Sequence, residues 1–170
     1  MTVLTGCLEE SPLGRIWVAV GENGLVAVDL WDDEARFAAM VYKLTKEMPV
    51  YDVAGVTAVT LQLHEYFQQT RQVFDLPIDW SVMTPFQQTA LHAVYAVPYG
   101  QVSTYGEIAR RINKPTAVRA VGHANGSNPI PIIIPCHRIL GSDGKLHGYG
   151  APGSLETKAW LLRLEGSWLI

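Results

Sequence analysis

The hydrophobic pattern of the first half of the chain predicts a small sheet with helices around it. Residues 16–20 and 25–28 are short apolar runs that alternate in the manner of strands, and an Asn-Gly pair lies between them. Asn and Gly accept the positive φ of a tight turn, so the two runs are expected to pair as a hairpin. Residues 33–46 and 58–69 place apolar side chains at helical spacing. We therefore expect a short antiparallel sheet with flanking helices.

The second half of the chain predicts three helices with well-marked ends. Thr84–Gln87 matches a capping box with proline at the first helical position, and Thr104–Glu107 matches a second box. The first helix is expected to run toward Pro98 and the second to about Ile112. A third helix is expected over residues 116–126, where a glycine ends it.

The second and third of these helices are short and are joined by a tight turn that contains a proline. Together with the basic side chains that they carry, this pattern predicts a helix-turn-helix, and an ordinary helical hairpin is the alternative. Residues 117–124 are mostly small, with Arg119 projecting among them. Small residues let a backbone approach closely, which suits a shallow, sequence-independent fit to a DNA minor groove. They equally suit close packing on another helix.

The charge balance changes between the halves of the chain. Before Thr84, 5 basic residues stand against 12 acidic ones, a net charge of −7, whereas from Thr84 onward 8 stand against 4, a net charge of +4. The periodicity breaks over residues 75–80, close to this change, so we expect a domain boundary near residue 80. The C-terminal half could meet a polyanion that the N-terminal half would repel.

The composition excludes several classes of protein. The chain has 170 residues, 48% of them apolar and 17% charged, with a net charge of −3, which excludes a disordered or fibrous chain. No apolar run approaches the roughly 18 residues of a membrane span, and the start lacks a secretory signal. We expect a soluble protein in the reducing cytosol, with Cys7 and Cys136 as free thiols. Neither cysteine lies in a CxxC pair, which excludes a disulfide framework and a four-ligand zinc site of that spacing.

The segment 128–139 is the strongest candidate for chemistry. Its three prolines predict an extended backbone, and its isoleucines at 132–134 predict a buried strand or strut that holds Cys136 at a rigid end. The neighbouring His137 and Arg138 could favour the thiolate electrostatically. Neighbours on a strand point to opposite faces, so contact between Cys136 and His137 would require a turn or a bridging water. The alternative is a buried structural cysteine.

Another candidate for chemistry lies near the C-terminus. Residues 154–166 predict a helix with a serine cap and a glycine stop, and Glu165 occupies its last turn, where the helix dipole disfavours a carboxylate. A histidine oriented by this carboxylate would compensate it. That arrangement would make Glu165, His137 and Cys136 an orienter, a base and a nucleophile. A solvated glutamate is the alternative.

These motifs resemble those of a known family. The runs Pro135–Ile139, Asn128–Pro131 and Arg119–Gly122 closely resemble the O6-alkylguanine-DNA alkyltransferases, and the matching blocks extend from Thr84 to Gly166. The resemblance implies an α+β protein in two domains. Residues 1–80 would form an N-terminal α/β domain with a small antiparallel sheet in a ribonuclease H-like layout. Residues 81–170 would form a mostly helical DNA-binding and alkyl-acceptor domain with the helix-turn-helix, as in the short bacterial form of the family.

The resemblance also implies roles for single residues. Cys136 would accept the alkyl group, His137 would act as a base through a water, Glu165 would orient His137, and Tyr105 would help to protonate the leaving guanine. DNA contacts are implied for four residues, with Arg119 replacing the extruded nucleotide in the stack: Arg119, Thr104, Ala120 and Gly122. The substrate pocket and its support are implied for five more: Asn128, Ile139, Tyr149, Gly150 and Pro131. Asn125 and Gly150 stand where other members carry different side chains.

The implied function is the repair of DNA by a protein that acts once. It would flip O6-alkylguanine out of duplex DNA from the minor groove and keep the alkyl group as a thioether, with no cofactor and no metal. It would work in the cytoplasm as a monomer, and activity on O4-alkylthymine is left open. A non-catalytic module that binds alkylated DNA is the main alternative. A hydrolase that uses Cys136 and His137 for acyl transfer is the second.

Overall fold

The chain forms two units, and the first is built around a four-stranded sheet. The computed structural model describes residues 1–168, so residues 169 and 170, the last two of the expected C-terminal domain, lie outside the described part. Residues 1–83 and 84–170 form two compact units. The first unit contains, in chain order, β1 (Leu4–Leu8), β2 (Ile16–Gly21), β3 (Gly24–Asp29), α1 (Glu34–Thr45), β4 (Val50–Tyr51), the 3-10 turn η1 (Ala54–Val56), α2 (Thr57–Phe67) and the 3-10 turn η2 (Trp80–Val82).

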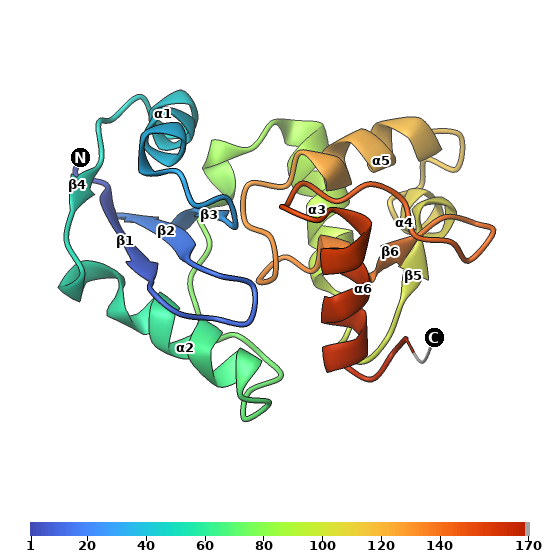
Figure 1. Cartoon of the computed structure of the whole chain (residues 1–170). Coiled ribbons are helices and arrows are strands. Elements are labelled where there is room, and N and C mark those ends of the chain that lie inside the picture. Colours follow the sequence, from blue (N-terminus) through green and yellow to red (C-terminus); the bar gives the residue numbers. More distant parts are fainter. Residues whose placement is uncertain (169–170) are drawn as a thin grey trace. The chain divides into compact units, whose positions relative to one another are not determined.

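The sheet of the first unit has the order β3-β2-β1-β4. Strands β1, β2 and β3 pair antiparallel, whereas β4 pairs parallel to β1, which the sequence pattern did not predict. Helices α1 and α2 cover opposite faces of the sheet (Figure 1). Strand β3 is therefore buried along its whole length instead of alternating. The hairpin is confirmed, and of its Asn-Gly pair only Gly24 takes a positive φ, of 122°.

The helices of the first unit bury most of their expected apolar faces. Asp33 caps α1, since its side chain accepts a hydrogen bond from the Arg36 backbone N–H. Phe37 and Val41 of α1 pack against the sheet, and Leu63 and Tyr66 of α2 are buried. Leu61, which falls on the predicted apolar spacing of α2, is 54% exposed, so that part of the prediction is wrong.

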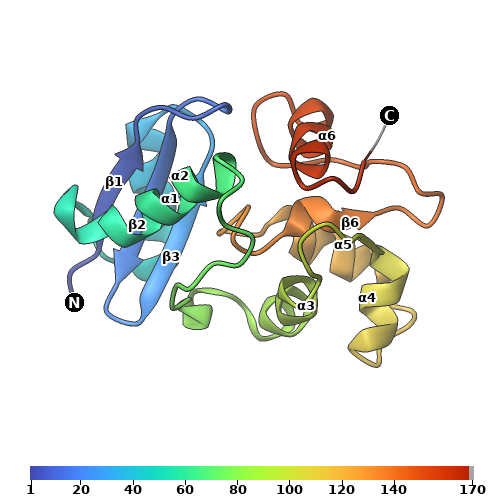
Figure 2. The same ribbon diagram turned by 90° about the horizontal axis from the view of Figure 1, so that it is seen from below.

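The second unit is mostly helical (Figure 2). Its elements are α3 (Pro85–Tyr95), β5 (Ser103–Thr104), α4 (Tyr105–Arg111), α5 (Val118–Gly126), the 3-10 turn η3 (Cys136–Arg138), β6 (Ile139–Leu140) and α6 (Leu155–Leu164). Both predicted capping boxes are present, at Thr84 and Thr104. Helix α4 and helix α5 pack on each other and on α3. The short β5 and β6 pair in parallel, which links the start of α4 to the segment that follows Cys136. The α+β class is confirmed.

The segment before Cys136 differs from the prediction. The backbone of 130–134 is a buried turn instead of a strand, because Ile132 takes a φ of 72° and Ile134 N–H donates to the Ile130 carbonyl at 2.9 Å. A positive φ is costly for a β-branched residue and persists only where surrounding contacts impose it. The prolines at 129 and 131 have no N–H to donate to a strand ladder, and a turn does not need those donors. Cys136 therefore opens a 3-10 turn.

The C-terminal helix also begins differently from the prediction. Ser154 precedes α6 but makes no side-chain cap; its hydroxyl oxygen instead accepts a hydrogen bond from the Tyr149 N–H at 3.2 Å. The serine cap is therefore wrong, because the loop that precedes the helix uses this hydroxyl. The glycine stop is confirmed by Gly166, whose φ is 76°.

Gly24 provides a test of the first unit. A Cβ at Gly24 would overlap the Pro77 carbonyl, which accepts a 2.8 Å hydrogen bond from the Leu25 N–H, and its φ is already unfavourable for alanine. We expect Gly24→Ala to lower the free energy of unfolding by about 2 to 4 kcal/mol. Gly14→Ala is the control, since its φ of 86° is similar and no atom lies within 4 Å of its Cβ position; it should lose only about 1 kcal/mol. Equal losses in urea denaturation would contradict the role assigned to the Pro77 contact.

Candidate active site

A buried ion pair fixes the segment that contains Cys136 to the end of α6. Glu165 Oε1 lies 2.8 Å from His137 Nε2, and both side chains are fully buried. Arg138 donates to the same carboxylate from Nε at 2.8 Å and from Nη2 at 2.9 Å, and its Nη1 donates to the Val97 carbonyl at 2.7 Å. His137 and Arg138, which are neighbours in η3, therefore both hydrogen-bond with the Glu165 carboxylate. A 3-10 turn allows this, whereas consecutive residues of a strand would point apart.

The protonation states of this cluster follow from its hydrogen bonds. Burial alone would raise the pKa of Glu165, but the bonds from His137 and Arg138 lower it to about 2, so the carboxylate is ionised and can only accept. Burial lowers the pKa of His137 against the opposing effect of Glu165, so the ring is neutral at pH 7. Its Nε2 must then carry the proton that points to Glu165, which leaves a lone pair on Nδ1. Within residues 1–168 this buried Nδ1 has no protein partner.

The Cys136 thiol is buried, and its electrostatics differ from the prediction. Burial raises its pKa, while a hydrogen bond from Asn128 and the charge of Lys158 lower it. The expectation that the side chains of His137 and Arg138 favour the thiolate is wrong, because both are held by Glu165. Cys136 is therefore a thiol at rest and needs a proton acceptor when it attacks.

Asn128 supports the turn that leads to Cys136. Its Nδ2 donates to the Ile134 carbonyl at 2.8 Å, and its Oδ1 accepts from the Ile130 N–H at 2.9 Å. Pro131 forms an isolated bridge with Ile134 inside the same turn. One amide side chain thus replaces two backbone hydrogen bonds and shapes the backbone that presents the thiol.

Lys158 is a site residue that the sequence reasoning missed. Its side chain is completely buried, and its Nζ donates to the Ile139 carbonyl at 2.7 Å and to the His147 carbonyl at 3.2 Å. Burial lowers its pKa to about 8, so it remains mostly protonated at pH 7 and lies within the electrostatic reach of Cys136. Helical spacing places it on one face of α6 with Leu161, Leu162 and Glu165, which are buried. The presence of Lys158 on the apolar face of α6 could have identified it from the sequence as a candidate functional cation.

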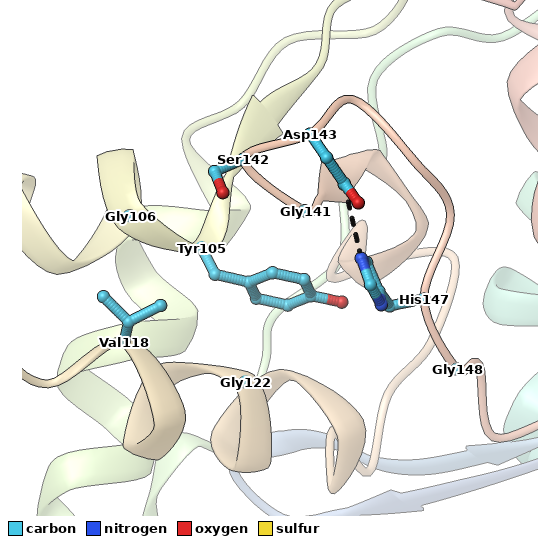
Figure 3. Close-up of a pocket in the computed structure, with 9 residues that line it drawn as sticks. All are labelled: Tyr105, Gly106, Val118, Gly122, Gly141, Ser142, Asp143, His147 and Gly148. Carbon is cyan, nitrogen blue, oxygen red and sulfur yellow. Dashed lines mark ion pairs between the residues drawn. The ribbon is translucent and has the colours of Figure 1, made fainter.

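Tyr105 lines a pocket of about 690 Å³ (Figure 3). Its side chain extends from the start of α4 into a space bounded by α5 and by the loop 141–148 (Figure 3). Burial and the neighbouring Cys136 raise the pKa of its hydroxyl, whereas a hydrogen bond with Asn125 lowers it. The cationic Nζ of Lys158 lies 5.8 Å from the centre of the Tyr105 ring. Tyr105 thus lines the pocket and lies within the electrostatic reach of Cys136.

Two further expected residues, Tyr149 and Gly150, directly follow the loop that lines the pocket, but neither is among the lining residues. Tyr149 is buried, its hydroxyl has no partner among residues 1–168, and burial raises its pKa well above the ordinary value. Gly150 lies against the end of α5, where a Cβ would approach the Gly126 carbonyl at 3.7 Å. The ring of His147 faces Tyr105 edge-on at 6.3 Å, and its Nε2 lies 3.5 Å from Asp143 Oδ1 (Figure 3).

The expected DNA contacts lie on the surface of α4 and α5. Arg119 and Ala120 are exposed in the first turn of α5, and Gly122 lines the pocket next to Tyr105. Thr104 uses its hydroxyl oxygen to cap α4, accepting from the Glu107 N–H at 3.1 Å. The expected DNA contacts therefore lie on or directly before the same two helices that contribute Tyr105 and Gly122 to the pocket.

Residues 1–168 contain no group of three or more His, Cys, Asp or Glu side chains placed to hold a metal ion. None of the helices in this part of the chain combines the length and apolar character that crossing a bilayer demands.

Comparisons with known proteins cover both units. Residues 85–167 match a family model described as "6-O-methylguanine DNA methyltransferase, DNA binding domain", and residues 5–80 match its "ribonuclease-like domain". A methylated-DNA–protein-cysteine methyltransferase of Haemophilus influenzae is 42% identical over 97% of this chain and 88% of its own, and one of Mycobacterium tuberculosis is 40% identical over 93% and 90%. The crystal structure of Mycobacterium tuberculosis OGT in complex with DNA superposes with a TM-score of 0.79 at 35% identity, over 98% of this chain and 94% of that one.

The ion pair of Glu165 predicts how stability depends on pH. Because the folded pKa of about 2 lies below the ordinary 4.5, the stabilisation is complete above pH 4.5 and is lost as the pH falls toward 2. The shift corresponds to about 3 kcal/mol. In urea denaturation between pH 6 and pH 2.5, wild-type protein should lose most of this amount. The Glu165→Gln variant should have a lower free energy of unfolding than wild type at pH 6, and this free energy should change less on acidification. Glu156→Gln, an exposed position on the same helix, should follow wild type, and parallel curves for all three proteins would refute the assignment.

Proposed function

The chain belongs to the 6-O-methylguanine DNA methyltransferase family, and from this premise we propose that it transfers the alkyl group of O6-alkylguanine in duplex DNA to its own Cys136. The activity is that of a methylated-DNA–protein-cysteine methyltransferase and serves DNA repair. The observation that carries the proposed role of Cys136 is a buried thiol followed by a histidine whose Nε2 is held by Glu165 and whose Nδ1 has a lone pair. DNA binding and alkyl acceptance are assigned to the C-terminal unit.

The proposed transfer is a displacement at the alkyl carbon. The sulfur of Cys136 forms a bond to that carbon while the bond between the carbon and guanine O6 breaks. The thiol proton passes to Nδ1 of His137, directly or through one water, and Glu165 stabilises the imidazolium that results. Tyr105 gives its hydroxyl proton to the departing guanine. Protonation of the leaving group matters because an anionic base would be poorly stabilised in a buried site.

The product explains why the protein acts once. A thioether has no good leaving group, so no second nucleophile removes the alkyl group from sulfur under ordinary conditions. One protein molecule therefore repairs one lesion, and the reaction needs no cofactor to drive it. The permanent modification of Cys136 is the feature that distinguishes this proposal from lesion binding alone.

The reacting oxygen lies inside the duplex, so the nucleotide must be flipped into the pocket beside Tyr105. Flipping requires a few kcal/mol and is easier where a lesion already weakens base pairing. Exposed Arg119 on α5 would fill the gap left in the stack, and the small side chains around it allow α5 to approach the minor groove. We assign O6-alkylguanine in double-stranded DNA as the substrate, with O4-alkylthymine as a candidate to test.

The same proposal describes a monomer that works in the cytoplasm. One chain carries every group that the transfer uses, from Tyr105 to Glu165. Cys7 and Cys136 are both free thiols. The proposed reaction needs Cys136 to be reduced, and a reducing compartment keeps thiols in that state.

Mass spectrometry tests the proposal directly. After incubation with duplex DNA that contains O6-methylguanine, the peptide with Cys136 should gain one methyl group, and the yield should stop at one methyl per protein molecule. Cys136→Ser should gain none and leave the lesion in place. Methylation at Cys7, or continued repair by one molecule, would refute the assignment; lesion binding with an unmodified Cys136 would identify a binding module.

Tyr105→Phe tests the route of the leaving-group proton. Loss of the hydroxyl should slow single-turnover methyl transfer by about 100-fold, the lower end of what general acid catalysis supplies. Affinity for undamaged duplex DNA should remain nearly unchanged, because the hydroxyl lies in the pocket and not on the exposed face of α5. Tyr42→Phe, at an exposed position of the first unit, is the matched control. Equal losses of rate and affinity would exclude this role.

A further inference from the structure

Asp143 and His147 are the charged part of the pocket that Tyr105 lines, and the scheme above gives them no role. Within residues 1–168 they are the two lining residues whose side chains can carry a charge at neutral pH. Four of the nine lining residues are glycines: Gly106, Gly122, Gly141 and Gly148. Because the glycines contribute no side chains, Asp143 and His147 decide the electrostatic character of the pocket.

Several contacts fix this pair on the pocket wall. His147 Nε2 lies 3.5 Å from Asp143 Oδ1 (Figure 3). The Lys145 backbone N–H donates to Asp143 Oδ1 at 3.0 Å, and the Lys158 ammonium donates to the His147 carbonyl at 3.2 Å. A Cβ at Gly141 would overlap both His147 Nε2 and Asp143 Oδ1, so the missing side chain allows the pair to lie against the backbone.

The pair lies at the mouth of the pocket. The side chains of His147 and Asp143 are 53% and 49% exposed, and the hydroxyl end of Tyr105 points toward them (Figure 3). The ring centres of Tyr105 and His147 are 6.3 Å apart. When a flipped base enters a pocket, its sugar and phosphates stay outside, because they are continuous with the rest of the strand. The phosphates of a flipped nucleotide would therefore come close to Asp143 and His147.

The Asp143 carboxylate is an unfavourable neighbour for those phosphates. The Lys145 backbone N–H and the His147 side chain hold the pKa of Asp143 below its ordinary value, so the carboxylate is ionised at neutral pH. Of the four acidic residues from Thr84 onward, it is the one that lines the pocket. Like charges repel, so a neutral His147 leaves an unfavourable charge at the mouth, whereas a protonated His147 cancels it.

The groups around His147 come from three other elements as well as from its own loop. The loop provides the Asp143 carboxylate and, beside it, Lys145; α4 provides the Tyr105 hydroxyl, and α6 provides the Lys158 ammonium. The lining residues from α5 are uncharged. Asp143 favours the imidazolium and the lysines oppose it, so bound phosphates would tip the balance. Histidine is the side chain whose charge ordinarily changes between pH 5 and pH 8.

We propose that His147 is a substrate-binding residue of this pocket: protonation of its imidazole neutralises Asp143, and the pocket accepts the flipped nucleotide with the uptake of one proton. This inference rests on the proposed function, since it assumes that a nucleotide of DNA flips into this pocket. The pair acts on the affinity for the lesion, because neither side chain gives or takes a proton in the displacement at the alkyl carbon.

Single-turnover transfer at increasing concentrations of duplex DNA with O6-methylguanine tests the proposal. The half-saturating concentration reports binding and flipping, whereas the limiting rate reports the chemical step. For wild type, the half-saturating concentration should be about fivefold lower at pH 6 than at pH 8, the effect of one unit charge at an exposed site. For His147→Asn it should stay at the wild-type value for pH 8 at both pH values. The limiting rate should follow wild type.

Asp143→Asn tests the repulsive charge separately. Asparagine keeps the oxygen that accepts from the Lys145 N–H, and the exposed position leaves the core unchanged. At pH 8 the half-saturating concentration of this variant should be about fivefold lower than that of wild type. His123→Asn, at an exposed position of α5 outside this pocket, is the matched control and should keep the wild-type response to pH.

Three results would overturn the proposal. These are a full response to pH in His147→Asn, an effect of His147→Asn on the limiting rate alone, and weaker binding by Asp143→Asn at pH 8. If wild-type protein moved no methyl group to Cys136 at any pH, the proposed function itself would fail. That outcome is distinct from an active protein whose response to pH does not depend on His147.

Discussion

The active site depends on one buried carboxylate. Glu165 accepts hydrogen bonds from His137 and from two nitrogens of Arg138, and all three side chains are buried. Removing one partner from such a cluster would leave an uncompensated charge in a region of low dielectric, which typically costs about 3 to 5 kcal/mol. The cluster therefore has two consequences. It fixes the turn that follows Cys136 to the end of α6, and it selects the tautomer of His137 that leaves Nδ1 free to accept a proton.

The burial of Cys136 indicates that alignment of the sulfur contributes more to the rate than activation of the thiol does. An ordinary cysteine with a pKa of about 8.5 is roughly 3% thiolate at pH 7, and lowering the pKa by two units would raise this fraction ~25-fold. If the Brønsted slope of ~0.45 for thiol exchange applies, nucleophilicity would fall ~8-fold, so the net gain would be only about threefold. Burial instead raises the pKa of this thiol. Alignment of sulfur with the alkyl carbon is worth up to ~7 to 11 kcal/mol, far more than the gain that burial forgoes.

The free protein leaves several groups of the site under-satisfied. His137 Nδ1, Asn125 Oδ1 and the Tyr149 hydroxyl are buried without protein partners in the described chain, and Ile132 holds an unfavourable φ of 72°. The backbone conformation of Ile132 is expected to cost about 1 to 3 kcal/mol, whereas the three polar atoms can form hydrogen bonds with a water or a substrate. All four features belong to the second unit, in which Asn128 and Lys158 donate to backbone carbonyls on either side of Cys136 along the chain. A site arranged this way is preorganised for a reaction that each molecule performs once.

The sequence predicted several local features of the fold, the family and the activity. The hairpin, the capping boxes at Thr84 and Thr104 and the glycine stop at Gly166 depend on a few neighbouring residues, and local chemistry decides them. The family, with its α+β fold and its activity, followed from motifs whose spacing is also local. The turn at Ile132, the engagement of Arg138 and the burial of Lys158 did not follow. They depend on which residues far apart in the chain meet: Glu165 lies 27 residues beyond Arg138, and Lys158 reaches Ile139 across 19. The sequence by itself determined the hairpin, the capped helices and which chemistry is carried. Only the tertiary structure decided the charge of each group, because protonation depends on burial and on partners that folding alone brings together.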